Sequence, residues 1–217
     1  MPTEIVVVDD QELMRLGFRM VINSQPDLKV IGEAADGAQA ITAARVLRPD
    51  LMLMDIRMPD VDGLQATRDI IASGSSAKIL ILTTFDLDEY VYEALRAGAS
   101  GFVLKDDPPE QLIAAVRTVA AGDALLSPAV TRRVIKQFTR VPRPSPPKEL
   151  SELTDREYEI FALIADGLSN AEIGARLFIT DTTVKTHITH IFQKLGVRDR
   201  VQAVVLAYRT GVFGPDG

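Results

Sequence analysis

The stretch LMLMDIRMPD at residues 51–60 decides the fold, because four apolar residues run directly into a carboxylate and a Met-Pro turn. An apolar run of this length that ends in a turn signal is typical of a strand buried on both faces of a parallel sheet. In sheets of this kind the functional side chains lie at the carboxyl ends of the strands. The stretch therefore predicts a buried strand that holds Asp55 at its tip.

Similar short apolar runs recur through the first half of the chain, separated by longer stretches of helical period. The predicted strands lie at residues 4–8, 29–33, 51–54, 79–82 and 101–104. Parallel neighbours need crossover connections, which are usually helices and almost always right-handed. Residues 1–121 are therefore expected to form a doubly wound α/β domain, a five-stranded parallel sheet with the topology (βα)5.

The chain changes character after residue 121. Residues 122–150 are expected to be a linker, with a helix at about 127–140 and then a semi-rigid spacer that holds four prolines within residues 141–147. Residues 151–217 carry four helix-capping signatures, which begin at Thr154, Ser169, Thr180 and Asp199. The last segment is therefore predicted to be a small all-α domain of four helices.

Composition limits the classes of function. The 217 residues carry a net charge of −6, and residues 1–121 hold 11 Lys and Arg against 19 Asp and Glu. This acidic excess indicates a carboxylate-rich site in the first domain. The absence of cysteine excludes disulfides, thiolate metal sites and thiol catalysis. No stretch approaches the roughly 18 apolar residues of a membrane span, so we expect a soluble, cytoplasmic protein with no membrane contact.

The predicted strand ends bring together a specific set of side chains. Asp9 and Asp10 follow the first strand, Asp55 the third, Thr83 the fourth and Lys105 the fifth. Clustered carboxylates repel one another unless a divalent cation lies among them, and oxygen ligands favour Mg²⁺. Lys105 and Thr83 suit the oxygens of a phosphoryl group, which makes Asp55 the natural nucleophile.

Each of these residues also has a purely structural interpretation. Asp10 alone would be a helix cap, Asp55 a turn residue, Thr83 a strand end and Lys105 a surface charge. The set favours a site, because four strand ends each deliver the required residue type. The acidic run at 60–63 lacks the glycine that an EF-hand needs at its sixth position, and Asp62 is predicted to cap a helix instead.

The motifs Asp9-Asp10, LMLMDIRMPD, ILTTFD at 81–86 and GASGFVLKD at 98–106 resemble the flavodoxin-like receiver domain of bacterial response regulators. The resemblance implies that Asp55 is the phosphoacceptor and that Asp9 and Asp10 bind Mg²⁺. It adds the backbone carbonyl of Arg57 as a metal ligand and Phe102 as the aromatic that changes rotamer when Thr83 moves to the phosphate. Many receivers have proline where Asp106 stands.

The helix expected at 181–195 has two unlike faces. Its apolar stripe consists of Val184, Ile188, Ile191 and Leu195, and small polar residues lie opposite: Thr182, Thr186, Thr189 and Gln193, with Lys185 on the flank. A narrow polar face with a lysine can enter a major groove. A solvated helix face is the structural alternative, and the net charge of −2 over residues 151–217 partly supports it.

Residues 153–200 resemble the LuxR-type helix-turn-helix domain. The resemblance implies that residues 180–195 are the recognition helix. Lys185, Thr186 and Thr189 are the expected DNA contacts, joined by Thr182 and His190. For His187 and His190 we favour phosphate contact or packing over metal binding. Members of the family often have lysine or arginine where this chain has Thr189, which implies weaker DNA contacts for each monomer. Pairing of two domains on adjacent half-sites is expected to compensate for that loss of affinity.

Together these features predict a response regulator of the NarL/FixJ type, a transcriptional regulator and not an enzyme. A sensor histidine kinase would phosphorylate Asp55, and the protein would then form a homodimer and bind promoter DNA, with RNA polymerase a possible further partner. Two alternatives stay open. One is a receiver that acts as a phosphate-independent docking module. The other is an aspartyl-phosphate phosphohydrolase, which would typically carry an acid where Arg57 stands.

Overall fold

The computed structural model describes residues 1–83, 88–122 and 148–210, with the side chains of all of them except 88–92, 148–149 and 209. The chain divides into two compact units, Met1–Leu125 and Leu126–Gly217. The predicted linker helix at 127–140 and the proline-rich spacer lie outside the described residues. No helix within the described ranges is both long and apolar enough to cross a membrane.

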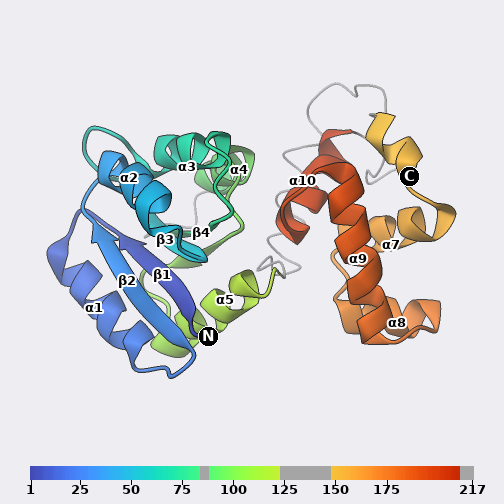
Figure 1. Cartoon of the computed structure of the whole chain (residues 1–217), viewed down its shortest axis with the longest axis horizontal. Helices are drawn as coiled ribbons and strands as arrows, with labels where there is room; N and C mark the ends of the chain where they lie inside the picture. The colour runs from blue at the N-terminus through green and yellow to red at the C-terminus, as the bar shows by residue number, and fades with distance from the viewer. Residues whose placement is uncertain (84–87, 123–147, 211–217) are drawn as a thin grey trace. The chain divides into compact units, whose positions relative to one another are not determined.

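The first unit is built on a parallel sheet of five strands in the order β2-β1-β3-β4-β5 (Figure 1). The strands are β1 (Thr3–Val8), β2 (Leu28–Ala34), β3 (Leu51–Asp55), β4 (Lys78–Thr83) and β5 (Gly101–Leu104). They alternate with α1 (Glu12–Asn23), α2 (Gly37–Leu47), α3 (Gly63–Ala72), α4 (Asp88–Ala97) and α5 (Pro109–Ala120). The predicted doubly wound sheet is confirmed. Asp55 and Thr83 are the last residues of their strands, because β3 and β4 each end one residue later than predicted.

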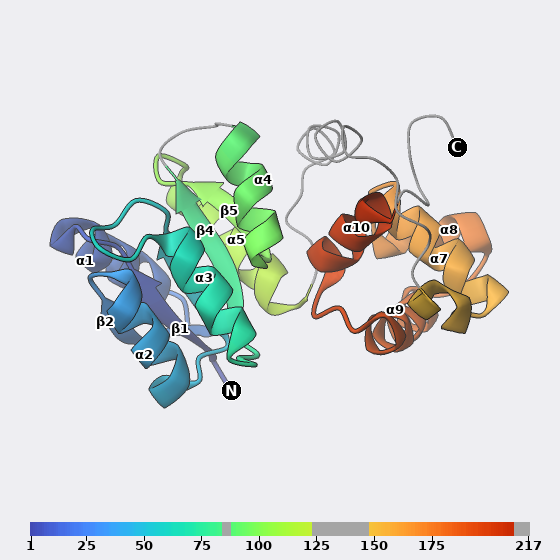
Figure 2. The same cartoon turned by 90° about the horizontal axis from the view of Figure 1, so that it is seen from above.

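Helices cover both faces of the sheet, with α1 and α5 on one side and α2, α3 and α4 on the other (Figures 1 and 2). Strand β3 lies at the centre, and its residues alternate between the two cores. Leu51 and Leu53 face the core that includes Phe18 of α1, whereas Met52 and Met54 face the core under α2 and α3. Each such side chain contributes about 1.5–3 kcal/mol by its burial. The continuous apolar run in the sequence follows from this burial on both sides.

Helices and the short loops between them make up the described residues of the second unit. After the 3₁₀ turn η1 (Lys148–Glu152) come α7 (Asp155–Ala165), α8 (Asn170–Leu177), α9 (Asp181–Leu195) and α10 (Arg200–Arg209). All four predicted caps are confirmed: the side chains of Thr154, Ser169, Thr180 and Asp199 each accept a hydrogen bond from the backbone three residues on. The predicted four-helix domain is therefore observed, with α7 packed against α9 and α10.

The loop between β3 and α3 is fixed by contacts of its own backbone. The Gly63 amide donates to the Ile56 carbonyl at 2.9 Å, and the Asp62 side chain accepts from the Gln65 amide at 2.7 Å, the cap predicted from the sequence. A Cβ atom at position 63 would overlap the carbonyl oxygen of Asp55. Because this neighbour is backbone, it cannot move aside without displacing the end of β3. Only glycine allows so close a turn beneath Asp55.

We predict that Gly63→Ala destabilises the first unit by about 1–3 kcal/mol, because the added methyl group must displace packed backbone. The matched control is Gly17→Ala in α1, where an added Cβ meets nothing within 4 Å. That change should raise stability by about 0.5–1 kcal/mol, since alanine loses less entropy in a helix. Urea unfolding followed by circular dichroism measures both. Equal stability of the two variants would contradict the proposed constraint.

Candidate functional site

Three carboxylates meet at the carboxyl edge of the sheet, as the strand pattern predicts. Asp9 and Asp10 lie in the loop after β1, and Asp55 ends β3. One carboxylate oxygen of each lies within 4.8 Å of the others. The Asp9 residue is fully buried and Asp55 is 5% exposed, whereas Asp10 is exposed. The cluster is therefore open to solvent on the Asp10 side and closed beneath.

Lys105 joins this cluster from the end of β5. Its Nζ atom lies 2.6 Å from Asp9 Oδ2 and 3.0 Å from Asp55 Oδ2, with 6% of the side chain exposed. Its amide donates to the Thr83 carbonyl at 2.8 Å, which ties the end of β5 to the end of β4. Buried like charges are tolerated only with a counter-charge. Lys105 supplies one positive charge against three negative ones, so the site stays anionic.

The environment shifts the acidity of this pair. Burial raises the pKa of Asp55, and the contacts with Lys105 offset only part of that shift. Burial alone would lower the pKa of Lys105, but its contacts with Asp9 and Asp55 together outweigh burial and raise it. Both directions have one origin, since the pocket is poor in water and rich in negative charge. An added cation would favour the ionised form of Asp55.

The residues fit a hard divalent cation. All three ligand groups offer carboxylate oxygens, the donors that Mg²⁺ prefers. Asp9 Oδ2 is buried, and the ammonium of Lys105 at 2.6 Å occupies only one of its lone pairs. This oxygen therefore keeps a lone pair available. The geometry supports a metal site at Asp9, Asp10 and Asp55.

The remaining residues predicted for this site surround the same edge. The Arg57 amide donates to the Asp55 carboxylate, which lowers the pKa of Asp55 against the effect of burial. Thr83 ends β4 and is 8% exposed. Phe102 on the neighbouring strand β5 is half-buried and packs against the core under α2 and α3. The fold thus places Arg57 and Thr83 at the carboxyl ends of β3 and β4, whereas Phe102 lies two residues before the end of β5.

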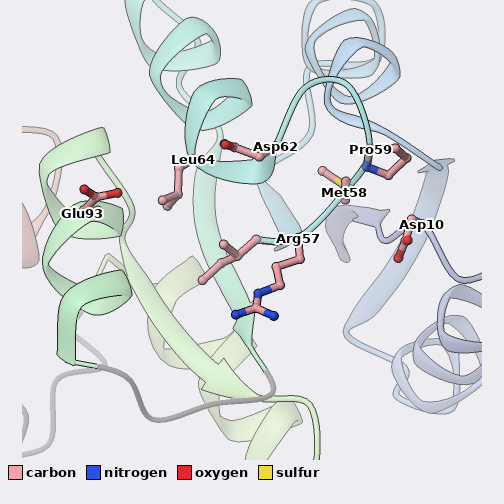
Figure 3. Close-up of a pocket in the computed structure, with 8 residues that line it drawn as sticks. Asp10, Arg57, Met58, Pro59, Asp62, Leu64 and Glu93 are labelled. Carbon is pink, nitrogen blue, oxygen red and sulfur yellow. The ribbon is translucent and has the colours of Figure 1, made fainter.

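A cavity of about 570 Å³ opens beside the acidic cluster. Asp10, Arg57, Met58 and Pro59 border it from the loops after β1 and β3, and Glu93 faces them from α4 (Figure 3). The other lining residues are Ile56, Asp62 and Leu64. Met58, Leu64 and Glu93 were not predicted from the sequence, because nothing in the local pattern places α4 opposite the loop after β3. The cavity gives a reactant direct access to the cluster.

Helix α9 of the second unit presents the two faces expected from its sequence. Val184, Ile191 and Leu195 are buried, and Ile188 is half-buried. Every residue predicted to contact DNA is exposed: Thr182, Lys185, Thr186, Thr189 and His190. Lys185 Nζ lies 2.9 Å from Asp181 Oδ2, and more than half of its side chain is exposed. The outer face is therefore polar and exposed, with three small threonines beside Lys185 and His190.

The inner face of α9 is anchored to α7 by one ion pair. Lys194 Nζ lies 2.6 Å from Glu157 Oε2, and the same carboxylate accepts the Thr154 amide and hydroxyl at 2.8 and 2.9 Å. Hydrogen bonding from Lys194, then from the Thr154 backbone, lowers the pKa of Glu157 from 4.5 to about 2. Glu157 thus serves at once as a helix cap and as the partner that orients α9.

Comparisons with known proteins agree with both units. The family described as response regulator receiver domain matches residues 5–117, and bacterial regulatory proteins of the luxR family match residues 151–207. The transcriptional regulatory protein YxjL of Bacillus subtilis is 45% identical over 209 residues, 96% of each chain. The nitrate/nitrite response regulator NarL of Escherichia coli K12 is 38% identical over 212 residues, 98% of each chain. The crystal structure of the response regulator ChrA, from a heme-sensing two-component system, superposes with a TM-score of 0.52 at 35% identity, covering 98% of this chain and 99% of that one.

We predict that Glu157→Gln lowers the stability of the second unit by about 1–3 kcal/mol at neutral pH, because charged hydrogen bonds to a buried acceptor are lost. A lowered folded-state pKa gives a contribution that is complete above 4.5 and disappears as the pH falls toward about 2. The difference between wild type and variant should shrink over that range. Urea unfolding at several pH values measures it.

Glu159→Gln is the matched control. It lies in the same helix, pairs with Arg156 and has 51% of its side chain exposed, so it should cost less than about 1 kcal/mol. Equal losses in the two variants, or a Glu157→Gln loss that persists at pH 2, would contradict the role of the ion pair with Lys194.

Proposed function

We propose, for a chain that belongs to the NarL/LuxR family of two-component response regulators, that Asp55 is the phosphoacceptor and α9 the DNA-reading helix. The protein is a phosphorylation-regulated, DNA-binding transcriptional regulator. The observation that carries the residue assignment is the convergence of Asp9, Asp10 and Asp55 on Lys105 at one sheet edge, beside an open cavity.

Asp55 would act as the nucleophile on a phosphohistidine. One carboxylate oxygen forms the new bond to phosphorus, the bond from phosphorus to the imidazole nitrogen breaks, and the imidazole leaves with its electron pair. The ammonium of Lys105, 3.0 Å from Asp55 Oδ2, stabilises the charge on the phosphoryl oxygens. The cavity beside Asp10 and Arg57 admits the donor from the solvent side.

Asp9, Asp10, Asp55 and the Arg57 carbonyl would hold Mg²⁺. When bound, the ion neutralises the carboxylates and the incoming phosphoryl oxygens. The buried lone pair on Asp9 Oδ2 and the all-oxygen donor set support this assignment. Asp10, the exposed member, lies on the side from which the ion enters.

A conformational switch would connect the phosphoryl group to the edge of the sheet that β5 forms. Thr83 ends β4 within the same edge, and Phe102 lies on β5, the strand paired with β4. Once phosphorylated, Asp55 would draw the Thr83 hydroxyl inward, and Phe102 would change rotamer to fill the space left behind. This change would remodel the surface of α4 and β5, a two-state element biased by one covalent charge.

The second unit would bind the major groove through the exposed face of α9. Lys185 and the hydroxyls of Thr182, Thr186 and Thr189 are the expected contacts, with His190 on the same side. Since residues 151–217 carry a net charge of −2, each copy of this helical domain offers few phosphate contacts. A homodimer that engages two half-sites would supply the missing affinity.

The expected partners follow from this scheme. They are a sensor histidine kinase in the cytoplasm, a second copy of the chain, double-stranded promoter DNA and RNA polymerase. The structure of an RcsB–DNA complex has the same overall fold at 21% identity, with a TM-score of 0.56. That likeness extends to the fold alone, so the DNA contacts proposed for this chain depend on its own exposed side chains.

We predict that acetyl phosphate with Mg²⁺ converts the wild-type chain to a dimer and raises its affinity for a duplex of random sequence by on the order of 10²-fold, through bivalent binding. Asp55→Asn should show neither effect. The control is Asp60→Asn, an exposed acid in the same loop whose left-handed backbone, with φ of 63°, asparagine tolerates. Analytical ultracentrifugation and fluorescence anisotropy measure the two responses. Undiminished stimulation in Asp55→Asn would refute the assignment.

We predict that Lys185→Ala weakens DNA binding across sequences and lowers the slope of log affinity against log salt by about 1, because one phosphate contact is lost. The control is Arg45→Ala, which removes the same charge from an exposed position on α2. Anisotropy titrations at several salt concentrations give both slopes. If the two variants change the slope equally, the effect belongs to net charge and not to α9.

A further inference from the structure

Arg15 of α1 contacts the main chain that carries two of the three carboxylates. Its Nη1 donates to the Asp9 carbonyl at 2.8 Å and lies 3.4 Å from the Asp10 carbonyl. Only 15% of the side chain is exposed. The guanidinium is held in turn by Glu33 of β2, whose Oε2 lies 3.3 Å from Arg15 Nε. The guanidinium is thus held from two sides behind the acidic cluster, by Glu33 and by the two main-chain carbonyls.

The contact completes the set of bonds that orient Asp9. Its amide donates to the Ala34 carbonyl at 3.1 Å, its Oδ1 accepts the Gln11 amide at 3.0 Å, and its Oδ2 meets Lys105. The main-chain carbonyl is the remaining polar group of Asp9, and it accepts a hydrogen bond from Arg15. Within the part of the chain that the structure describes, Asp10 has no comparable set of hydrogen bonds, so the same guanidinium limits the freedom of both residues.

Electrostatics and positioning predict opposite effects for this arginine. A cation close to a metal site repels the incoming metal, so removing its charge should strengthen Mg²⁺ binding. Removing a group that orients the ligands should weaken it, because the ligand residues must then be ordered when the metal binds. The sign of the change therefore separates the two roles.

We propose that Arg15 is a positioning residue for the metal site, one that fixes the main chain at Asp9 and Asp10 so that both carboxylates face Asp55. This inference rests on the proposed Mg²⁺ site. Arg15 touches neither the metal ligand atoms nor the phosphoryl group. It acts through two backbone carbonyls, and Glu33 determines where its guanidinium lies.

Titration of the ¹⁵N-labelled full chain with MgCl₂, followed by the amide shifts of the acidic loop, measures the affinity without any phosphorylation. Arg15→Gln should raise the Kd for Mg²⁺ by about 10-fold or more. Arg15→Lys keeps the charge but loses the planar guanidinium, so its Kd for Mg²⁺ should lie between those of the wild type and Arg15→Gln. Arg19→Gln is the control, because Arg19 also pairs with Glu33, at 2.8 Å, but is 47% exposed. Its Kd should equal that of the wild type or be slightly lower.

The outcomes separate the inference from the proposal beneath it. A wild-type chain whose acidic loop shows no saturable shift would refute the metal site and the role of Arg15 together. Saturable binding in the wild type with equal or tighter binding in Arg15→Gln would overturn the role of Arg15 alone. If Arg15→Gln does not fold, Arg15→Lys decides, since wild-type affinity in that variant would leave only a charge effect. A higher Kd for Mg²⁺ in Arg15→Gln, with an unchanged melting temperature, supports the positioning role.

Discussion

Repulsion among three carboxylates at one edge of the sheet is the constraint on which the first unit depends. Two unit charges about 4 Å apart interact by about 4 kcal/mol at an effective dielectric constant near 20, and the three oxygens here lie within 4.8 Å of one another. The folded chain must hold them against that force. It does so with Lys105 inside the cluster and with buried strands on both sides of Asp55. A divalent cation would relieve this repulsion and, together with Lys105, offset the negative charge that a phosphoryl group adds.

The sequence predicted the parts of the structure that follow from chain periodicity. Strand alternation placed Asp9, Asp55, Thr83 and Lys105 at one edge, because parallel strands end on the same side. It could not predict contacts that depend on how helices pack. Glu93 reaches the cavity from α4, and Arg15 reaches back from α1 to the Asp9 carbonyl. The sequence also could not predict the start of α5, where the Asp107 side chain accepts the Leu104 amide at 3.0 Å and Pro108 takes the capping position.

The second unit meets a different requirement, since it must expose polar groups in a fixed orientation. Four side-chain caps define where its helices begin, and each was visible in the sequence because capping is a local property. The ion pair between Glu157 and Lys194 was not, because it joins residues 37 positions apart. That pair fixes the inner face of α9 and leaves Lys185 and the threonines at the surface. Rigidity on one side of the helix thus supports recognition on the other.

The measurement that tests the central claim most directly is the intact mass of the chain after incubation with acetyl phosphate, with and without Mg²⁺. The account predicts one added phosphoryl group in the wild type, which requires Mg²⁺ and which tandem mass spectrometry assigns to Asp55. Addition at another residue, addition that needs no Mg²⁺, or no addition even with a histidine kinase as donor would contradict it.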